Sequence, residues 1–234
     1  MSTTTTALLL GLLAGLLLLW LERSCRAAQE TDWGGFWLNR LDGLNRLYCR
    51  QYQHLPPVTV PLPQSGAAIV VSNHISGLDP LLMIAASRRP LRFMIAREQY
   101  QRFGLRWLFR AVGCIPVDRS GNPEKAMRQA FKALREGQVV AMFPHGKIHL
   151  DSDPPRKIKA GAARLASITG APVVPLRISG VRAQGRIFSP LILRGRAVIE
   201  ILPLLESRDV ESGVLNRRIQ ELLDGVMESS KAGQ

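Results

Sequence analysis

Two residues of the sequence, His74 and Asp79, have the types and the spacing of a general base and a carboxylate that orients it. His74 follows the apolar run Ala67–Val71, which is typical of a strand buried on both faces. Asp79 precedes Pro80 and a second apolar run, so we expect it to be the N-cap of a helix. The turn from strand to helix can bring the carboxylate beside the imidazole, where it holds one ring nitrogen and leaves the other to accept a proton.

The same pair has a purely structural interpretation, because capping alone would explain Asp79 and would leave His74 an ordinary loop histidine. No covalent nucleophile competes with the pair. Ser76 lacks the Gly-x-Ser-x-Gly setting of a strained nucleophile, and Cys114 is expected within a strand. His145 and His149 lie four residues apart and precede two aspartates, but the surrounding prolines indicate a loop, and we expect no metal there.

A mostly parallel α/β sheet flanked by helices is expected to position these residues, because short apolar runs alternate with helical patterns from residue 67 onward. Ligands of such sheets gather at the carboxyl ends of strands, which is where Arg119 and the segment Pro144–Lys147 fall. We expect strands at residues 67–71, 92–96, 114–117, 139–143, 173–178 and 197–202, and helices at 98–110, 123–136 and 207–229.

The chain is strongly basic, with a formal charge of +13, so an anionic partner is expected: nucleic acid, or an anionic membrane and phosphorylated substrates. Seven arginines and only one acid, Glu98, lie between Arg88 and Arg110. Phe103 and Trp107 fall among them, which suits an anionic membrane surface or the phosphates of a lipid or coenzyme, although a solvated basic face is the alternative. The odd number of cysteines, 3, favours a reducing compartment.

The first 22 residues are predicted to be a transmembrane anchor. The run within Thr3–Leu21 carries no charge and ends near Trp20, at the position of an interfacial aromatic. A cleaved signal peptide is the alternative, but such peptides begin with Lys or Arg. Arg23 and Arg26 follow the run directly, so the positive-inside rule places the rest of the chain in the cytoplasm, at the inner membrane if the source is a bacterium.

Residues 23–65 are predicted to hold an amphipathic helix and a proline-rich linker, with a catalytic domain over 66–234. Apolar residues recur at helical spacing through Phe36–Gln53, with Arg40, Arg46 and Arg50 among them. Such a helix can lie in the lipid headgroup layer or pack on the core of the domain itself. The linker, Leu55–Ser65, contains four prolines.

Four segments in order resemble the conserved blocks of the glycerolipid acyltransferases, typified by 1-acylglycerol-3-phosphate (lysophosphatidic acid) acyltransferase. NHISGLD, residues 73–79, is similar to the NHxSxxD block of that family, and GCIPVDR, residues 113–119, to its second block. FPHG, residues 143–146, resembles the FPEGT block. VVPLRI, residues 173–178, resembles the closing strand, and Lys159-Ala160-Gly161 resembles the start of the helix before it.

The resemblance implies a glycerol-3-phosphate acyltransferase-like fold and a membrane-bound O-acyltransferase. Its substrates would be an acyl thioester, on coenzyme A or acyl carrier protein, and a lysophospholipid, first of all 1-acylglycerol-3-phosphate. No cofactor, metal or nucleic acid is implied, and anionic membrane lipids are expected partners. The implied catalytic residues are His74 and Asp79. The implied substrate contacts are Asn73, Ser76, Gly113, Arg119, Phe143, Pro144, His145, Gly146, Lys147, Lys159 and Pro175.

The third block departs from the family pattern, because His145 and Lys147 stand where the family has Glu and Thr. The change makes the pocket more positive, so we expect it to alter which acceptor or donor is preferred rather than the chemistry. Two other classes of protein are considered. A lipid-binding relative without turnover would keep the basic helices, and a basic nucleic-acid-binding protein would explain the charge but not the apolar N-terminal run.

Overall fold

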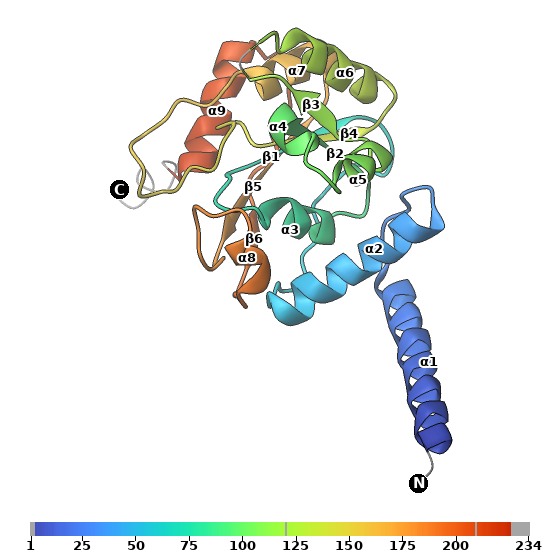
Figure 1. The fold of residues 1–234 in the computed structure, drawn as a ribbon. Helices are drawn as coiled ribbons and strands as arrows, with labels where there is room; N and C mark the ends of the chain where they lie inside the picture. The colour runs from blue at the N-terminus through green and yellow to red at the C-terminus, as the bar shows by residue number, and fades with distance from the viewer. Residues whose placement is uncertain (1–2, 120, 209, 226–234) are drawn as a thin grey trace.

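The computed structural model describes residues 3–119, 121–208 and 210–225, which fold into an α/β domain with an N-terminal helix projecting from it (Figure 1). Within these residues the sheet has six strands in the order β3-β2-β4-β1-β5-β6, and all pairings are parallel except that of β6 with β5. The predicted mostly parallel sheet is therefore confirmed. The strands are β1 Ala68–Ser72, β2 Leu91–Ala96, β3 Ile115–Val117, β4 Val139–Met142, β5 Val173–Ser179 and β6 Val198–Ile201.

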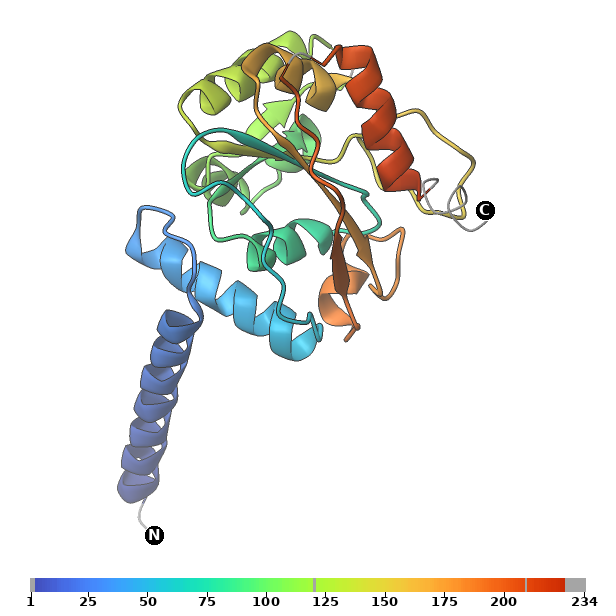
Figure 2. The same cartoon turned by 180° about the vertical axis from the view of Figure 1, so that it is seen from behind.

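Helices cover both faces of the sheet (Figures 1 and 2). Alternate side chains of β1 point to opposite faces, as the period of a strand requires. Ala68 and Val70 join the core under α3, whereas Ile69 and Val71 join the core under α6, α7 and α9. The helices of the domain are α3 Asp79–Ala86, α4 Arg97–Tyr100, α5 Arg106–Ala111, α6 Glu124–Arg135, α7 Gly161–Thr169, α8 Ser189–Ile192 and α9 Ser212–Asp224.

The C-terminal helix is shorter than the sequence predicts. The pattern indicates a helix over residues 207–229, but α9 begins at Ser212 and the left-handed Gly225 ends it. A glycine at this position terminates helices because it adopts a positive φ without steric cost. Residues 226–229 of the prediction lie outside the described part of the chain.

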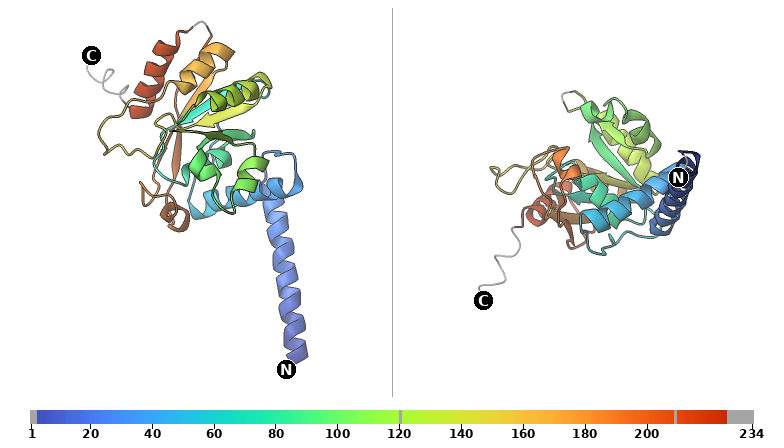
Figure 3. Two further views of the ribbon diagram at one scale, coloured as in Figure 1. Left: turned by 45° about the horizontal axis from the view of Figure 1, so that its top comes forward. Right: turned by 60° about the horizontal axis from the view of Figure 1, so that its bottom comes forward.

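The N-terminal helix α1, Thr3–Ala28, extends away from the domain (Figure 3). Among the described residues it is the one helix long and apolar enough to cross a membrane, judged by length and composition. It packs on α2, Phe36–Leu47, where Gly43 permits a very close approach. A Cβ at Gly43 would lie 1.8 Å from the carbonyl oxygen of Cys25, so no other residue fits there without moving α1.

The amphipathic segment is helical as predicted, through α2 and a π-helical turn, η1, over Tyr48–Tyr52. One face is exposed, with Trp37 at 77% of its maximal accessible surface, and the other face packs on α3. The structure thus shows packing on the domain for one face of the helix and leaves the other face exposed. Leu55 and Val60 of the proline-rich linker are buried, and the N–H of Val60 donates to Ala86 O at 2.8 Å, so the linker packs on the domain.

Arg46 lies on the buried face of α2. Its side chain is fully buried and pairs with Asp42, with 2.8 Å between Nε and Oδ2. Nη1 also donates to Ala85 O and Nη2 to Thr31 Oγ1, each at 2.8 Å. The guanidinium therefore ties α2 to the carboxyl end of α3 and to the segment that leaves α1.

The predicted helix over residues 98–110 is wrong as a single element. The chain forms two short helices, α4 and α5, with a turn between them that contains Gly104 at φ +78°. Only glycine adopts this conformation without strain, which explains the break. As a result Arg102 leaves the face of Arg106 and instead stacks over the ring of Phe188, 4.6 Å from its centroid.

Candidate active site

His74 and Asp79 meet at the carboxyl end of β1, which lies between the parallel strands β4 and β5. His74 Nδ1 lies 2.8 Å from Asp79 Oδ2. The carboxylate is completely buried, whereas the imidazole side chain keeps 18% of its surface exposed. The structure thus brings together the two residues that the sequence assigns to catalysis and leaves part of the imidazole accessible.

Asp79 does not act as the helix cap expected from the sequence. It is the first residue of α3, Leu78 occupies the N-cap position, and the carboxylate points back into the loop. Oδ2 accepts from the backbone N–H of Ile75 at 2.7 Å and of Ser76 at 2.8 Å, and Oδ1 accepts from Ser76 Oγ at 2.6 Å. An acceptor held in this way favours the His74 tautomer with its proton on Nδ1, which leaves Nε2 free to accept a proton.

Phe143 and His149 fix the imidazole from other elements. Phe143 follows β4, the neighbour of β1, and its ring stacks on His74 with 4.1 Å between centroids. The backbone N–H of His149 donates to His74 O at 2.8 Å. Because the carboxyl ends of β1 and β4 are adjacent, the first and third sequence blocks form one site.

Asn73 is placed beside the pair, but its side chain is occupied by the fold. Its amide accepts from Ile178 N at 2.7 Å and donates to Ile178 O at 2.9 Å, which links the loop after β1 to the end of β5. Ser76 is buried and bonded to Asp79, and its Oγ also accepts from Leu78 N. Both residues therefore act on the pair by holding its loop.

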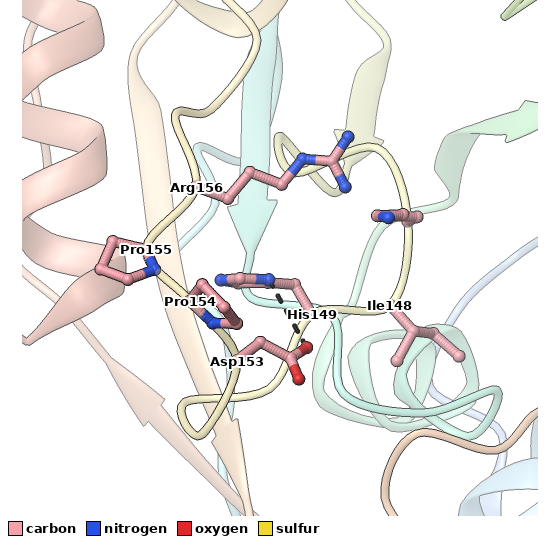
Figure 4. Close-up of a pocket in the computed structure, with 7 residues that line it drawn as sticks. Ile148, His149, Asp153, Pro154, Pro155 and Arg156 are labelled. Atoms are coloured by element: carbon pink, nitrogen blue, oxygen red, sulfur yellow. Dashed lines mark ion pairs between the residues drawn. The ribbon is translucent and has the colours of Figure 1, made fainter.

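A cavity of about 460 Å³ is lined by the loop that contains His149, whose backbone binds His74; His74 itself does not line it (Figure 4). Its charged lining is mainly basic, with Lys147, Arg156 and His149, and one acid, Asp153, is 3.6 Å from His149 Nδ1. The sequence blocks identify Lys147 but do not include His149 or Arg156.

His145 packs behind His149, and its side chain is buried without a hydrogen bond among the described residues. It is 3% exposed, and both ring nitrogens lack such a bond. Its ring stacks on His149 with 4.7 Å between centroids, and Nε2 is 3.7 Å from Asp224 Oδ1. Burial, followed by the neighbouring His149, lowers the pKa of His145. The ring therefore contributes shape and a neutral polar surface.

The remaining residues of the third and fourth blocks surround this loop. Gly146 has φ +74°, and a Cβ there would meet the side chain of Lys159 at 3.0 Å. The N–H of Lys159 donates to the carbonyl of the buried Pro144 at 2.9 Å. Pro175 is buried within β5, opposite Val71 of β1.

Two predicted site residues are not brought to His74. Gly113, at φ +70°, precedes β3 and packs against the side chain of Arg92, whose Nη1 would lie 1.5 Å from an added Cβ. Arg119 follows β3 at the carboxyl edge and is exposed, but β2 and β4 lie between β3 and β1. Gly113 is thus placed for packing, and Arg119 can reach only a ligand that extends along this edge.

The described residues hold no other obvious catalytic group. No three His, Cys, Asp or Glu side chains among them converge as metal ligands. Burial raises the pKa of the Cys114 thiol to about 12, so this sulfur is not a thiolate at neutral pH. The geometry is that of an α/β protein in which a partly exposed histidine is held by a buried carboxylate, an arrangement that can serve as a general base.

The chain belongs to the acyltransferase family, whose family model matches residues 49–179, more than half of its length. N-acylphosphatidylethanolamine synthase of Arabidopsis thaliana is 34% identical over 51% of this chain and 43% of its own. A probable 1-acyl-sn-glycerol-3-phosphate acyltransferase of Mycoplasma pneumoniae is 34% identical over 49% and 45%. The 1-acyl-sn-glycerol-3-phosphate acyltransferase of Bacillus subtilis is 25% identical over 69% and 83%.

The chain therefore spans less than half of the first two relatives and most of the third. Its fold also matches a solved structure, the 1-acyl-sn-glycerophosphate (LPA) acyltransferase PlsC from Thermotoga maritima. The TM-score is 0.61 at 20% identity, over 81% of this chain and 79% of that one. This likeness shows the fold, with the mostly parallel sheet and its flanking helices.

Proposed function

We propose that this chain transfers a fatty acyl group from an acyl thioester to the free hydroxyl of a lysophospholipid, with His74 as general base and Asp79 orienting it. The observation that carries the proposal is the 2.8 Å contact between His74 Nδ1 and a buried carboxylate that two backbone N–H groups also hold. Membership of the acyltransferase family supports the reaction class.

The geometry supports a direct transfer without a covalent enzyme intermediate. A lysolipid hydroxyl is a poor nucleophile at neutral pH, so His74 Nε2 takes its proton as the oxygen attacks the thioester carbonyl. Asp79 stabilises the imidazolium that forms. The tetrahedral intermediate then expels the thiolate, which takes the proton back from His74, and the products are the new ester and a free thiol.

The acceptor proposed first is 1-acylglycerol-3-phosphate, which would give phosphatidic acid. The names of the Mycoplasma pneumoniae and Bacillus subtilis relatives support it, as does the basic cavity that His149 lines. Lys147 and Arg156 present an ammonium and a guanidinium, the groups that bind phosphate oxygens most strongly. The donor is an acyl thioester of coenzyme A or acyl carrier protein.

The proposed location is a membrane, with α1 as the anchor and the catalytic domain on the cytoplasmic side. The apolar side chains of α1 are largely exposed, because the domain does not cover them, and a lipid environment would bury this apolar surface. Arg23 and Arg26 at its carboxyl end support this orientation, which in a bacterium means the inner membrane.

A thiol-release assay on membranes that hold the protein, with acyl-coenzyme A or acyl carrier protein and a panel of lysolipids, tests the proposal. We expect His74→Ala to lower the turnover rate by ~10³-fold or more, because the general base is lost. A variant that keeps a tenth of the activity would contradict the assignment of His74. No turnover by the wild-type protein with either donor would favour a lipid-binding relative without catalysis.

The same assay tests whether His145 sets the acceptor. Its ring lies against His149, which lines the cavity, so His145→Glu would add a negative charge behind the phosphate position. Because the family that the sequence resembles has Glu at this position, we expect the variant to use 1-acylglycerol-3-phosphate better than the wild-type protein does, relative to other lysolipids. An unchanged order of acceptors would show that this position does not determine specificity.

A further inference from the structure

A second basic site lies away from His74, in the turn after α4 and in α5. A cavity of about 700 Å³ opens there, lined by Gly104, Arg106, Trp107, Arg110 and Ala111. Trp107 is mostly exposed, and the ring of Phe103 beside it is fully exposed. An isolated exposed aromatic is ordinary, but here Trp107 lines a basic cavity and the exposed Phe103 directly precedes another lining residue, Gly104.

The positive charge of this surface is not neutralised by the protein. No ion pair to Arg106 or Arg110 is found among the described residues, and Glu98 is the one acid between Arg88 and Arg110. Arg97 pairs with Asp118 at 3.3 Å, and this pair accounts for a single charge. The cavity therefore presents two guanidinium groups to an anion from outside the chain.

The exposed apolar surface continues from here toward the N-terminal helices. Arg102 stacks on Phe188, just before α8, and the half-exposed ring of Phe188 adjoins the exposed Ile192 on that helix. α8 in turn binds η1, because Tyr48 Oη donates to Leu191 O at 2.8 Å. Contacts thus run from the turn to Phe188 and from α8 to η1, which continues α2, and α2 packs on α1.

We propose that the surface over residues 102–110 is a binding site for the anionic lipids of the bilayer in which α1 is anchored. A lipid phosphate binds between Arg106 and Arg110, while Phe103 enters the interfacial layer. An acidic carrier protein would match the arginines, but it would not explain a fully exposed Phe103 or the apolar continuity with α8. The inference rests on the proposed membrane location, and it adds a second, lipid-selective contact to the anchor.

Spin labelling of the full chain in lipid nanodiscs tests the site without turnover. Phe103→Cys places a nitroxide on the turn, and the three native cysteines are buried. Gln129→Cys on α6 is the matched control, because it is exposed on the opposite side of the sheet, away from α1 (Figure 1). The accessibility of each label to oxygen and to a polar nickel chelate is compared in discs of phosphatidylcholine with and without phosphatidylglycerol.

We expect the label at position 103 to move from chelate-accessible to oxygen-accessible when phosphatidylglycerol is present, and the label at 129 to stay in water. Adding Arg106→Gln and Arg110→Gln to the Phe103→Cys chain should shift the docking equilibrium back by about 30-fold, since each basic residue near an anionic surface contributes about fivefold.

Two results would overturn the proposal. The first is an accessibility of the label at position 103 that equals that of the control label at position 129 in every disc. A label that stays in water but loses mobility on addition of acyl carrier protein would assign the surface to that protein. Either result leaves the acyl-transfer proposal intact, because that one is decided by the thiol-release assay with His74→Ala, and loss of activity leaves the accessibility data unchanged.

Discussion

Replacing Asp79 by Asn tests whether the charge of this side chain, rather than its shape, supports His74. Oδ2 accepts from His74 Nδ1 and also from the backbone N–H groups of Ile75 and Ser76. The amide must therefore place its oxygen at the Oδ2 position, because an NH₂ group there would face two N–H donors. His74 then keeps its acceptor and its tautomer, the negative charge is lost, and the amide NH₂ donates to Ser76 Oγ where the carboxylate accepted from it.

The charge can be given a magnitude. Two unit charges ~4 Å apart interact by about 4 kcal/mol at an effective dielectric constant of about 20. The amide dipole recovers part of this energy, so the transition state with an imidazolium should rise by about 3 kcal/mol and kcat should fall by about 10²-fold. KM should change little, because the Asp79 side chain is completely buried and faces the loop of His74. Thiol release at saturating acyl-coenzyme A and acceptor measures the fall in kcat.

A matched control is Asp151→Asn. This carboxylate also pairs with a cation, Arg177 Nη2 at 2.7 Å, but it is 73% exposed and does not line the cavity. A surface pair of this kind contributes little, so kcat should stay within about twofold of the wild type. If Asp79→Asn keeps more than a third of wild-type kcat while it melts at the wild-type temperature, the charge does not act on His74 and the reasoning is refuted.

Two further predictions concern stability and are read from melting curves in detergent. The pKa of His145 is lowered by burial and by His149; Arg156 and His74 act in the same direction, and Asp224 opposes them. As the pH falls, the unfolded chain therefore takes up a proton at this residue before the folded protein does. Stability should therefore fall as the pH drops below about 6.5, and His145→Gln should reduce that fall; equal pH slopes would contradict this. Arg46→Ala leaves Asp42 buried and unpaired and should cost about 3–5 kcal/mol. Arg128→Ala on the exposed face of α6 should be nearly neutral, and a similar effect of both variants would argue against a structural role for Arg46.

The His74–Asp79 pair could be predicted from the sequence because everything that creates it is local. A five-residue separation, a buried strand before it and a proline-started helix after it confine the two side chains to one turn. The hydrogen bonds that hold the pair could not be predicted from the sequence. The role of Asp79 as an acceptor for the loop N–H groups, in place of a helix cap, depends on a backbone geometry that residue types alone do not specify.

Arg46 shows where prediction from local pattern fails. Helical periodicity places it on α2 beside other arginines, but its burial depends on carbonyl groups of α3, including Ala85, 39 residues further along the chain. The break between α4 and α5 was missed for a similar reason, because arginines spaced four residues apart favour a single helix. Gly104 was the one local indication of the break, but helices often tolerate a single glycine, so it does not predict where a helix ends.

The short helix α3 has a consequence for how the protein responds to its membrane. It begins with Asp79 and ends at the carbonyl groups that bind Arg46, a span of about 12 Å for eight residues. Arg46 belongs to α2, which is locked to α1 where Gly43 meets Cys25. Direct contacts therefore connect the proposed anchor, through α2 and α3, to the residue that holds the general base. A thinner or thicker bilayer would therefore tilt the whole molecule, and the height of His74 above the lipid would change with that tilt and not independently of it.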